Sequence, residues 1–176
     1  RNFCLNSNTV LTATAGTSYH WSDGSTLNTL TVTSPGTYSV TATNSNNCTA
    51  SASAVISTYS LPNPNITGNT SICQGATTQL TATVGNSYNW STGAVVPEIS
   101  VTTAGNYTVT VSNSQGCTSS ASVTVTVNPL PSAAISGTTS FCQGASTTLT
   151  ASGGATYQWN TGAATASILI SSAATY

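Results

Sequence analysis

The sequence contains almost no charge. Its 176 residues include one Lys or Arg, two Asp or Glu and one His, whereas charged residues make up about 25% of an average soluble domain. Phosphate binding needs clustered Lys and Arg, so nucleic acid is excluded as a main partner. No stretch approaches the roughly 18 apolar residues of a membrane span, and we expect no membrane insertion. No signal peptide precedes Arg1, which we interpret as a missing N-terminal region.

Hydroxyl groups take the place of charge. Ser and Thr together occupy 64 of the 176 positions, and hydrophobic residues make up 38%. Disordered chains combine low hydrophobicity with high net charge and few aromatic or β-branched residues. This composition, with its regularly placed Tyr, Trp, Val and Ile residues, therefore predicts a folded chain.

A step of 69 residues relates the chain to itself. Residues 73–107 and 142–176 share 17 identities over 35 aligned positions. The same step connects Trp21, Trp90 and Trp159; Cys4, Cys73 and Cys142; Cys48 and Cys117; and Tyr38, Tyr107 and Tyr176. A unit of this length is large enough for a small self-contained domain, whereas solenoid repeats run from 20 to 50 residues.

The phase of the repeat sets the expected domains. We expect repeat 1 at residues 1–59, repeat 2 at 60–128 and repeat 3 at 129–176, with only repeat 2 complete. Arg1 is equivalent to Thr70, and Tyr176 to Tyr107, so repeat 1 would lack its beginning and repeat 3 its last two strands. Proline residues, which stiffen a linker, lie at both boundaries: Pro62, Pro64, Pro129 and Pro131.

Apolar residues alternate with polar ones in short runs, which is the mark of strands buried on one face. In repeat 2 these runs cover residues 79–84, 88–90, 99–101, 107–111 and 121–127, with Gly and Asn between them. Six or seven short strands in 69 residues predict an all-β fold of tandem immunoglobulin-like antiparallel β-sandwiches. Trp21, Trp90 and Trp159, with Tyr38 and Tyr107, are expected in the cores.

The five cysteines follow the repeat. Cys4 and Cys48 are 44 residues apart, as are Cys73 and Cys117. This equal spacing predicts the disulfides Cys4–Cys48 and Cys73–Cys117, each tying two loops near one end of a sandwich. Cys142 would find its partner at about position 186. Disulfides indicate an oxidising, extracellular compartment.

Few residues could carry out chemistry. General acid–base catalysis needs a positioned His or carboxylate, and only His20, Asp23 and Glu98 are available. Repeats 2 and 3 have Asn89 and Gln158 in place of His20, so the residue is not built into the repeat. No Cys-x-x-Cys pair suggests zinc, and the linkers hold no carboxylate for calcium. We expect neither an enzyme nor a cofactor or metal.

Repeat 2 contains a series of motifs: Cys-x-Gly at 73–75, Leu-Thr-Ala at 80–82, Tyr-x-Trp-Ser-Thr-Gly at 88–93, Gly-x-Tyr-x-Val-Thr at 105–110, Asn-x-x-x-Cys at 113–117 and Asn-Pro-x-Pro at 128–131. This series resembles the immunoglobulin-like and PKD-like repeats of very large secreted surface proteins of Bacteroidota. That family includes gliding-motility and adhesion proteins exported by the type IX secretion system. The resemblance implies export to the cell surface and a role in adhesion or gliding.

Three functional hypotheses follow. The first is a stalk or spacer of a large cell-surface adhesin or filament, in which neighbouring repeats of the same chain are the partners. In the second, the repeats themselves adhere through edge strands, to surface glycans or to other copies of the chain. The third is an accessory array attached to a secreted enzyme.

Overall fold

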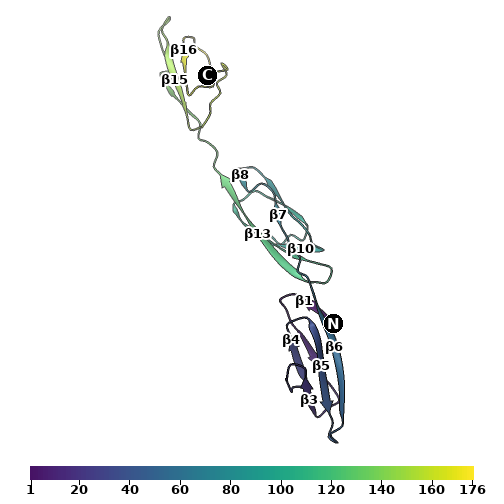
Figure 1. Cartoon of the computed structure of the whole chain (residues 1–176). Coiled ribbons are helices and arrows are strands. Elements are labelled where there is room, and N and C mark those ends of the chain that lie inside the picture. Colours follow the sequence, from purple (N-terminus) through teal and green to yellow (C-terminus); the bar gives the residue numbers. More distant parts are fainter. The chain divides into compact units, whose positions relative to one another are not determined.

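The structure, a computed structural model, describes residues 1–176 and consists of strands and loops without a helix (Figure 1). This confirms the all-β class. The chain separates into two compact units. One comprises residues 1–72 and 76–126, and the other residues 73–75 and 127–176. Repeats 1 and 2 lie almost wholly in the first unit.

Repeat 1 forms two sheets, in the strand orders β1-β6-β5-β3 and β2-β4. Its strands are β1 (Asn2–Cys4), β2 (Thr9–Thr12), β3 (Ser18–Trp21), β4 (Thr29–Val32), β5 (Gly36–Thr43) and β6 (Thr49–Tyr59). Between the sheets lies one apolar cluster, formed by Phe3, Leu11, Ala13, Trp21, Leu30, Val32 and Ile56.

Repeat 2 also forms two sheets, β10-β12-β13-β8 and β11-β9-β7. Its strands are β7 (Ile66–Thr67), β8 (Ser71–Cys73), β9 (Thr78–Ala82), β10 (Ser87–Trp90), β11 (Glu98–Val101), β12 (Gly105–Ser112) and β13 (Thr118–Asn128). The five runs predicted from alternation correspond to β9 to β13. Seven strands agree with the predicted six or seven, but the positions of the short strands β7 and β8 were not predicted, because three or fewer residues give no readable period.

Alternation in β12 explains how the sandwich closes. Val109 and Val111 point inward and have no exposed surface. On the other face, the hydroxyl groups of Thr108 and Thr110 form hydrogen bonds of 2.8 and 2.9 Å with serines of the neighbouring β13. One face of the sheet therefore buries apolar surface, while cross-strand hydroxyl pairs cover the other.

Two hydrogen bonds support the immunoglobulin-like description. The hydroxyl of Tyr107, at the start of β12, donates to the carbonyl oxygen of Thr103 at 3.0 Å, which is the geometry of a tyrosine corner. The indole nitrogen of Trp90, on β10, donates to the carbonyl oxygen of Val96 at 2.9 Å. Equivalent bonds link Tyr38 to Ser34, and Trp21 to Leu27.

The first strand of repeat 1 departs from a purely antiparallel sandwich. β1 pairs in parallel with the end of β6, with Cys4 opposite Tyr59. In repeat 2, β8 lies beside β13. Cys4 and Cys73 thus belong to strands, whereas the sequence had placed them in loops.

The second unit contains one three-stranded sheet in the order β14-β15-β16. Its strands are β14 (Ala134–Gly137), β15 (Thr147–Ser152) and β16 (Ser167–Ile170). They are equivalent to β7, β9 and β11 of repeat 2. Its buried cluster consists of Leu149, Trp159, Ile168 and Ile170.

Candidate functional site: a disulfide between repeats

One disulfide connects the first two repeats. Cys4 bonds to Cys117, with a Cα–Cα distance of 5.5 Å and a sequence separation of 113. Cys48, Cys73 and Cys142 are free and exposed. The predicted pairings Cys4–Cys48 and Cys73–Cys117 are therefore wrong, although a disulfide is present.

The length of one strand explains the error. Cys4 lies opposite Tyr59, at the end of β6, whereas Cys48 directly precedes Thr49, where β6 begins. Eleven residues of strand at about 3.3 Å each separate the two ends by roughly 36 Å, and a disulfide requires Cα atoms within about 7 Å. The two cysteines of a repeat thus lie at opposite ends of its sandwich.

The five cysteines belong to two structural kinds. We call Cys4, Cys73 and Cys142 the strand cysteines, because the first two end β1 and β8 and the third is their equivalent in repeat 3. We call Cys48 and Cys117 the loop cysteines, because each closes the turn that precedes the last strand of its repeat. The observed bond joins a strand cysteine to a loop cysteine.

A single asparagine builds the loop that presents Cys117. The side-chain oxygen of Asn113 accepts hydrogen bonds from the backbone nitrogens of Gln115 and Cys117, at 3.0 and 2.9 Å. The backbone of Asn113 and Cys117 closes the turn with a further bond of 3.0 Å. Gly116 adopts a φ of 79°, which glycine accepts without strain. The spacing Asn-x-x-x-Cys therefore encodes a defined loop.

The same asparagine also holds the linker. Its side-chain nitrogen donates to the carbonyl oxygen of Ser60 at 2.9 Å. Ser60 directly follows Tyr59, whose own carbonyl accepts the backbone nitrogen of Leu5 at 2.9 Å. Hydrogen bonds at two successive residues, Tyr59 and Ser60, thereby connect the start of the linker to the strand of Cys4 and to the loop of Cys117.

Cys117 is deeply buried, with 1% of its surface exposed. Cys48, at the equivalent place in repeat 1, is exposed and unbonded. The Cys4 side of the bond is only partly covered. Bond formation and burial of the loop cysteine accompany each other at this junction, which is the pattern of a structural disulfide.

The candidate catalytic residues form no site. His20 lies exposed on β3, and Glu98 accepts a hydrogen bond from the Thr81 hydroxyl at 3.2 Å. Asp23 is fully exposed, and its carboxylate accepts a hydrogen bond of 3.0 Å from the backbone nitrogen of Ser25. That bond lowers the pKa of Asp23, and the charge of His20 makes only a minor contribution. An exposed carboxylate in a turn has no arrangement that would activate a substrate.

The aromatic residues expected in the core face inward. Trp21, Trp90 and Trp159 keep 3% to 6% of their surface exposed, and Tyr107 keeps 8%. Tyr38 is half-buried against the repeat 1 cluster. No tryptophan is therefore available as an exposed platform on which a sugar could stack.

One hollow in the second unit has a volume of about 560 Å³. Its walls are formed by Pro131, Ala133–Ile135, Ala151, Ser152, Gly154 and Thr156–Trp159. None of these side chains is charged, and no titratable group other than Tyr157 faces the hollow. Its polar side chains are the uncharged Ser152, Thr156, Tyr157 and Gln158, and the remaining walls are apolar.

No group of three or more His, Cys, Asp or Glu side chains is placed to hold a metal ion. Residues 1–176 contain no helix that is long and apolar enough to cross a membrane.

Comparison with protein-family models and with curated proteins gives no match. Among solved structures, murine CEACAM1b aligns with 72% of this chain and 96% of its own, at 12% identity and a TM-score of 0.31. The titin I-band fragment I67–I69 aligns with 86% of this chain and 72% of its own, at 15% identity and a TM-score of 0.32. A structure on Dscam isoform specificity aligns with 73% of this chain and 43% of its own, at 16% identity and a TM-score of 0.30. At these identities and scores the likeness is weak, and the chain's own strands and hydrogen bonds define its fold.

Proposed function

We propose that this chain is a load-bearing spacer of a large repetitive cell-surface protein of the adhesin type. The observation that carries the proposal is the Cys4–Cys117 bond, which connects repeat 1 to repeat 2. A disulfide also favours an oxidising compartment outside the cytosol. The resemblance to Bacteroidota surface repeats adds adhesion or gliding as the specific setting of the spacer.

The position of the bond matters under tension. A force applied to the two ends of the chain passes from Cys4 to Cys117 directly through the two sulfur atoms. The residues between them, which include all of repeat 1 after β1 and most of repeat 2, lie inside a covalent loop. They cannot be drawn out by the pulling force while the bond is intact. This is a property that a spacer needs and an isolated binding domain does not.

The surface suits a spacer as well. Hydroxyl pairs cover the outer face of the long strands in both repeats, for example Thr41 with Ser51 at 2.9 Å and Thr110 with Ser120 at 2.9 Å. With one cationic and two acidic side chains in the whole chain, neighbouring copies experience almost no electrostatic repulsion. Many chains could therefore lie side by side on a crowded cell surface.

Immuno-electron microscopy of the producing cells, with antibody raised against the chain 1–176, tests the proposal. Label along projections from the cell surface is the expected result. Label confined to the culture fluid would overturn it and would favour the accessory array of a secreted enzyme. Label in the cytosol would contradict both, because a reducing compartment does not maintain the Cys4–Cys117 bond.

A further inference from the structure

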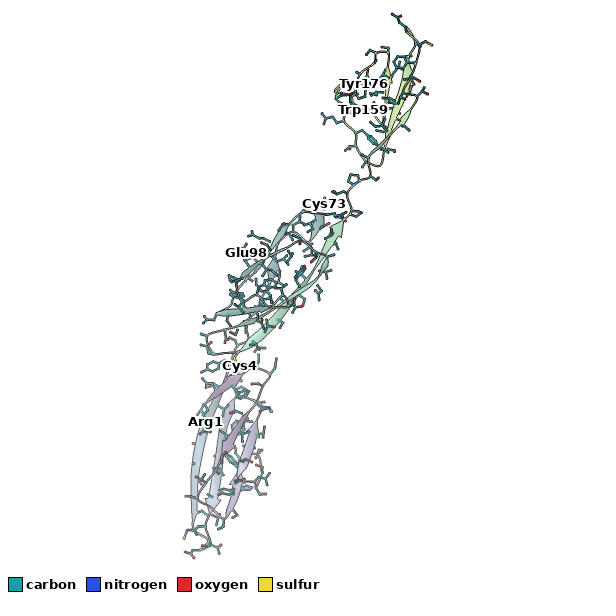
Figure 2. All side chains as sticks on the ribbon, turned by 180° about the vertical axis from the view of Figure 1, so that it is seen from behind. Arg1, Cys4, Cys73, Glu98, Trp159 and Tyr176 are labelled. Carbon is teal, nitrogen blue, oxygen red and sulfur yellow. A yellow bond between two sulfur atoms is a disulfide. The ribbon has the colours of Figure 1, made fainter.

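Cys73 occupies the same backbone setting as the bonded Cys4. In repeat 1, the nitrogen of Leu5 donates to the carbonyl of Tyr59 at 2.9 Å. In repeat 2, the nitrogen of Gln74 donates to the carbonyl of Asn128 at 2.8 Å. Both donors directly follow a strand cysteine, and both acceptors end the long last strand of the repeat. Figure 2 shows Cys73 beside the end of β13, at the surface.

Cys48 likewise occupies the setting of the bonded Cys117. The side-chain oxygen of Asn44 accepts the nitrogens of Asn46 and Cys48, at 2.9 and 3.0 Å. Asn47 takes the left-handed conformation, with φ of 59°, that Gly116 takes in the other loop. The loop is thus already formed around a free, exposed thiol.

We propose that Cys73 and Cys48 are the two halves of further disulfides of the Cys4–Cys117 kind. Cys73 bonds to the loop cysteine of a repeat seated after repeat 2, and Cys48 bonds to the strand cysteine of a repeat seated before repeat 1. The disulfide partner of Cys73 is therefore a cysteine in an Asn-x-x-x-Cys loop. It is supplied by the same polypeptide or by a second copy of the chain, whose Cys48 is such a cysteine.

This rule links every repeat to both of its neighbours. The covalent loop closed by Cys4 and Cys117 contains Cys73, so the next loop would begin inside the first. Overlapping loops leave no junction that is held by its linker alone. The inference concerns which thiols pair, and it does not depend on the adhesive role proposed above.

The chemistry requires an oxidant, and a small disulfide such as oxidised glutathione is sufficient. The Cys73 thiolate attacks one glutathione sulfur, breaking the glutathione S–S bond and releasing one reduced glutathione. The thiolate of the loop cysteine then attacks the sulfur of Cys73, forming the new bond and releasing the second. Two cysteine thiols are oxidised, one glutathione disulfide is reduced, and the two protons pass to the released thiolates.

The first arm of the test uses the chain 1–176 as it stands. Copies labelled with ¹⁵N are mixed with unlabelled copies in a glutathione redox buffer. The products are digested with chymotrypsin, because a chain with one Lys or Arg offers trypsin almost no cleavage site. Disulfide-linked peptides are then identified by mass. A bond between Cys48 of one copy and Cys73 of another identifies the second copy as the source. Cys48→Ser should then abolish the cross-linked species, and Cys142→Ser should leave at least half of it.

The second arm tests the same polypeptide as the source. A copy of residues 108–128 is appended after Tyr176, which supplies repeat 3 with a loop cysteine. The expected product is a bond within one chain between Cys73 and the appended cysteine, lost in Cys73→Ser and retained in Cys142→Ser. The proposal would be overturned if either arm gave strand-to-strand or loop-to-loop disulfides in amounts equal to the strand-to-loop disulfides. The absence of a strand-to-loop bond at Cys73 in both arms would overturn it as well.

Discussion

Asn113 and Ser60 meet across 2.9 Å, with the side-chain nitrogen of Asn113 donating to the Ser60 carbonyl. The oxygen of the same side chain accepts the backbone nitrogens of the loop that holds Cys117. One side-chain amide therefore forms hydrogen bonds both within the loop and to the linker. Its counterpart in repeat 1, Asn44, makes the loop bonds alone.

This difference leads to a first prediction. Asn113→Ala removes three hydrogen bonds and leaves the buried nitrogen of Cys117 without an acceptor, at a cost of about 1–3 kcal/mol. Starting from reduced protein in glutathione buffer, we expect closure of the Cys4–Cys117 bond to slow at least threefold, measured by mass spectrometry of quenched samples. Asn44→Ala is the matched control and should leave that rate unchanged. Equal slowing by both variants would contradict a specific role for the linker contact.

The covalent loop predicts a length change in single-molecule pulling. When the chain is held at both ends, the intact bond should keep the segment between Cys4 and Cys117, a sequence separation of 113, from extending. Reduction should release it and add roughly 40 nm to the contour length, at 3.3–3.6 Å per residue. Cys117→Ser should show the longer contour without reductant, and Cys142→Ser should behave as the unmodified chain. The same contour before and after reduction would show that the bond does not carry the load.

The tyrosine corner predicts a local loss of stability. Tyr107→Phe removes the hydrogen bond to the Thr103 carbonyl and a second one with the Thr103 hydroxyl at 2.9 Å. We expect a loss of about 1 kcal/mol, visible as about fivefold faster amide hydrogen exchange in β11 and β12. Exchange in β4 and β5 of repeat 1 should not change, and it serves as the internal control. Uniform acceleration along the chain would indicate instead that the two repeats unfold as one unit.

Acid should affect the turn at Asp23. The hydrogen bond from Ser25 lowers the pKa of Asp23 below 3.8, so the ionised carboxylate is the form that stabilises the fold. This contribution is complete well above the unfolded-state pKa and is lost as the pH falls through the lowered pKa of the folded state. The melting temperature of Asp23→Ala should therefore lie slightly below that of the unmodified chain at pH 6, and the gap should close towards pH 2. A gap that persists at pH 2 would show that the charge of Asp23 is not its cause.

Much of the fold could be read from the sequence because burial follows the period of a strand. Val109 and Val111 alternate with Thr108 and Thr110, and a sheet has only two faces, so the apolar set must face the core. Trp90 and Tyr107 stand at positions where an immunoglobulin-like sandwich has an inward tryptophan and a tyrosine corner. Each of these inferences depends on residues that are close in sequence.

The pairing of the cysteines could not be read in this way. The equal spacing of Cys4–Cys48 and Cys73–Cys117 suggested bonds within repeats, yet spacing along a chain does not say at which end of a strand a residue lies. That depended on β1, a strand of three residues, lying beside the end of β6 instead of its beginning.

The sequence by itself determined the β-sandwich, its inward aromatic residues and the Asn-x-x-x-Cys loops, because local periodicity and short-range hydrogen bonds specify them. Only the tertiary structure decided that Cys4 meets Cys117. An 11-residue strand holds the two cysteines of one repeat roughly 36 Å apart, while the linker at Ser60 brings the ends of two successive repeats together.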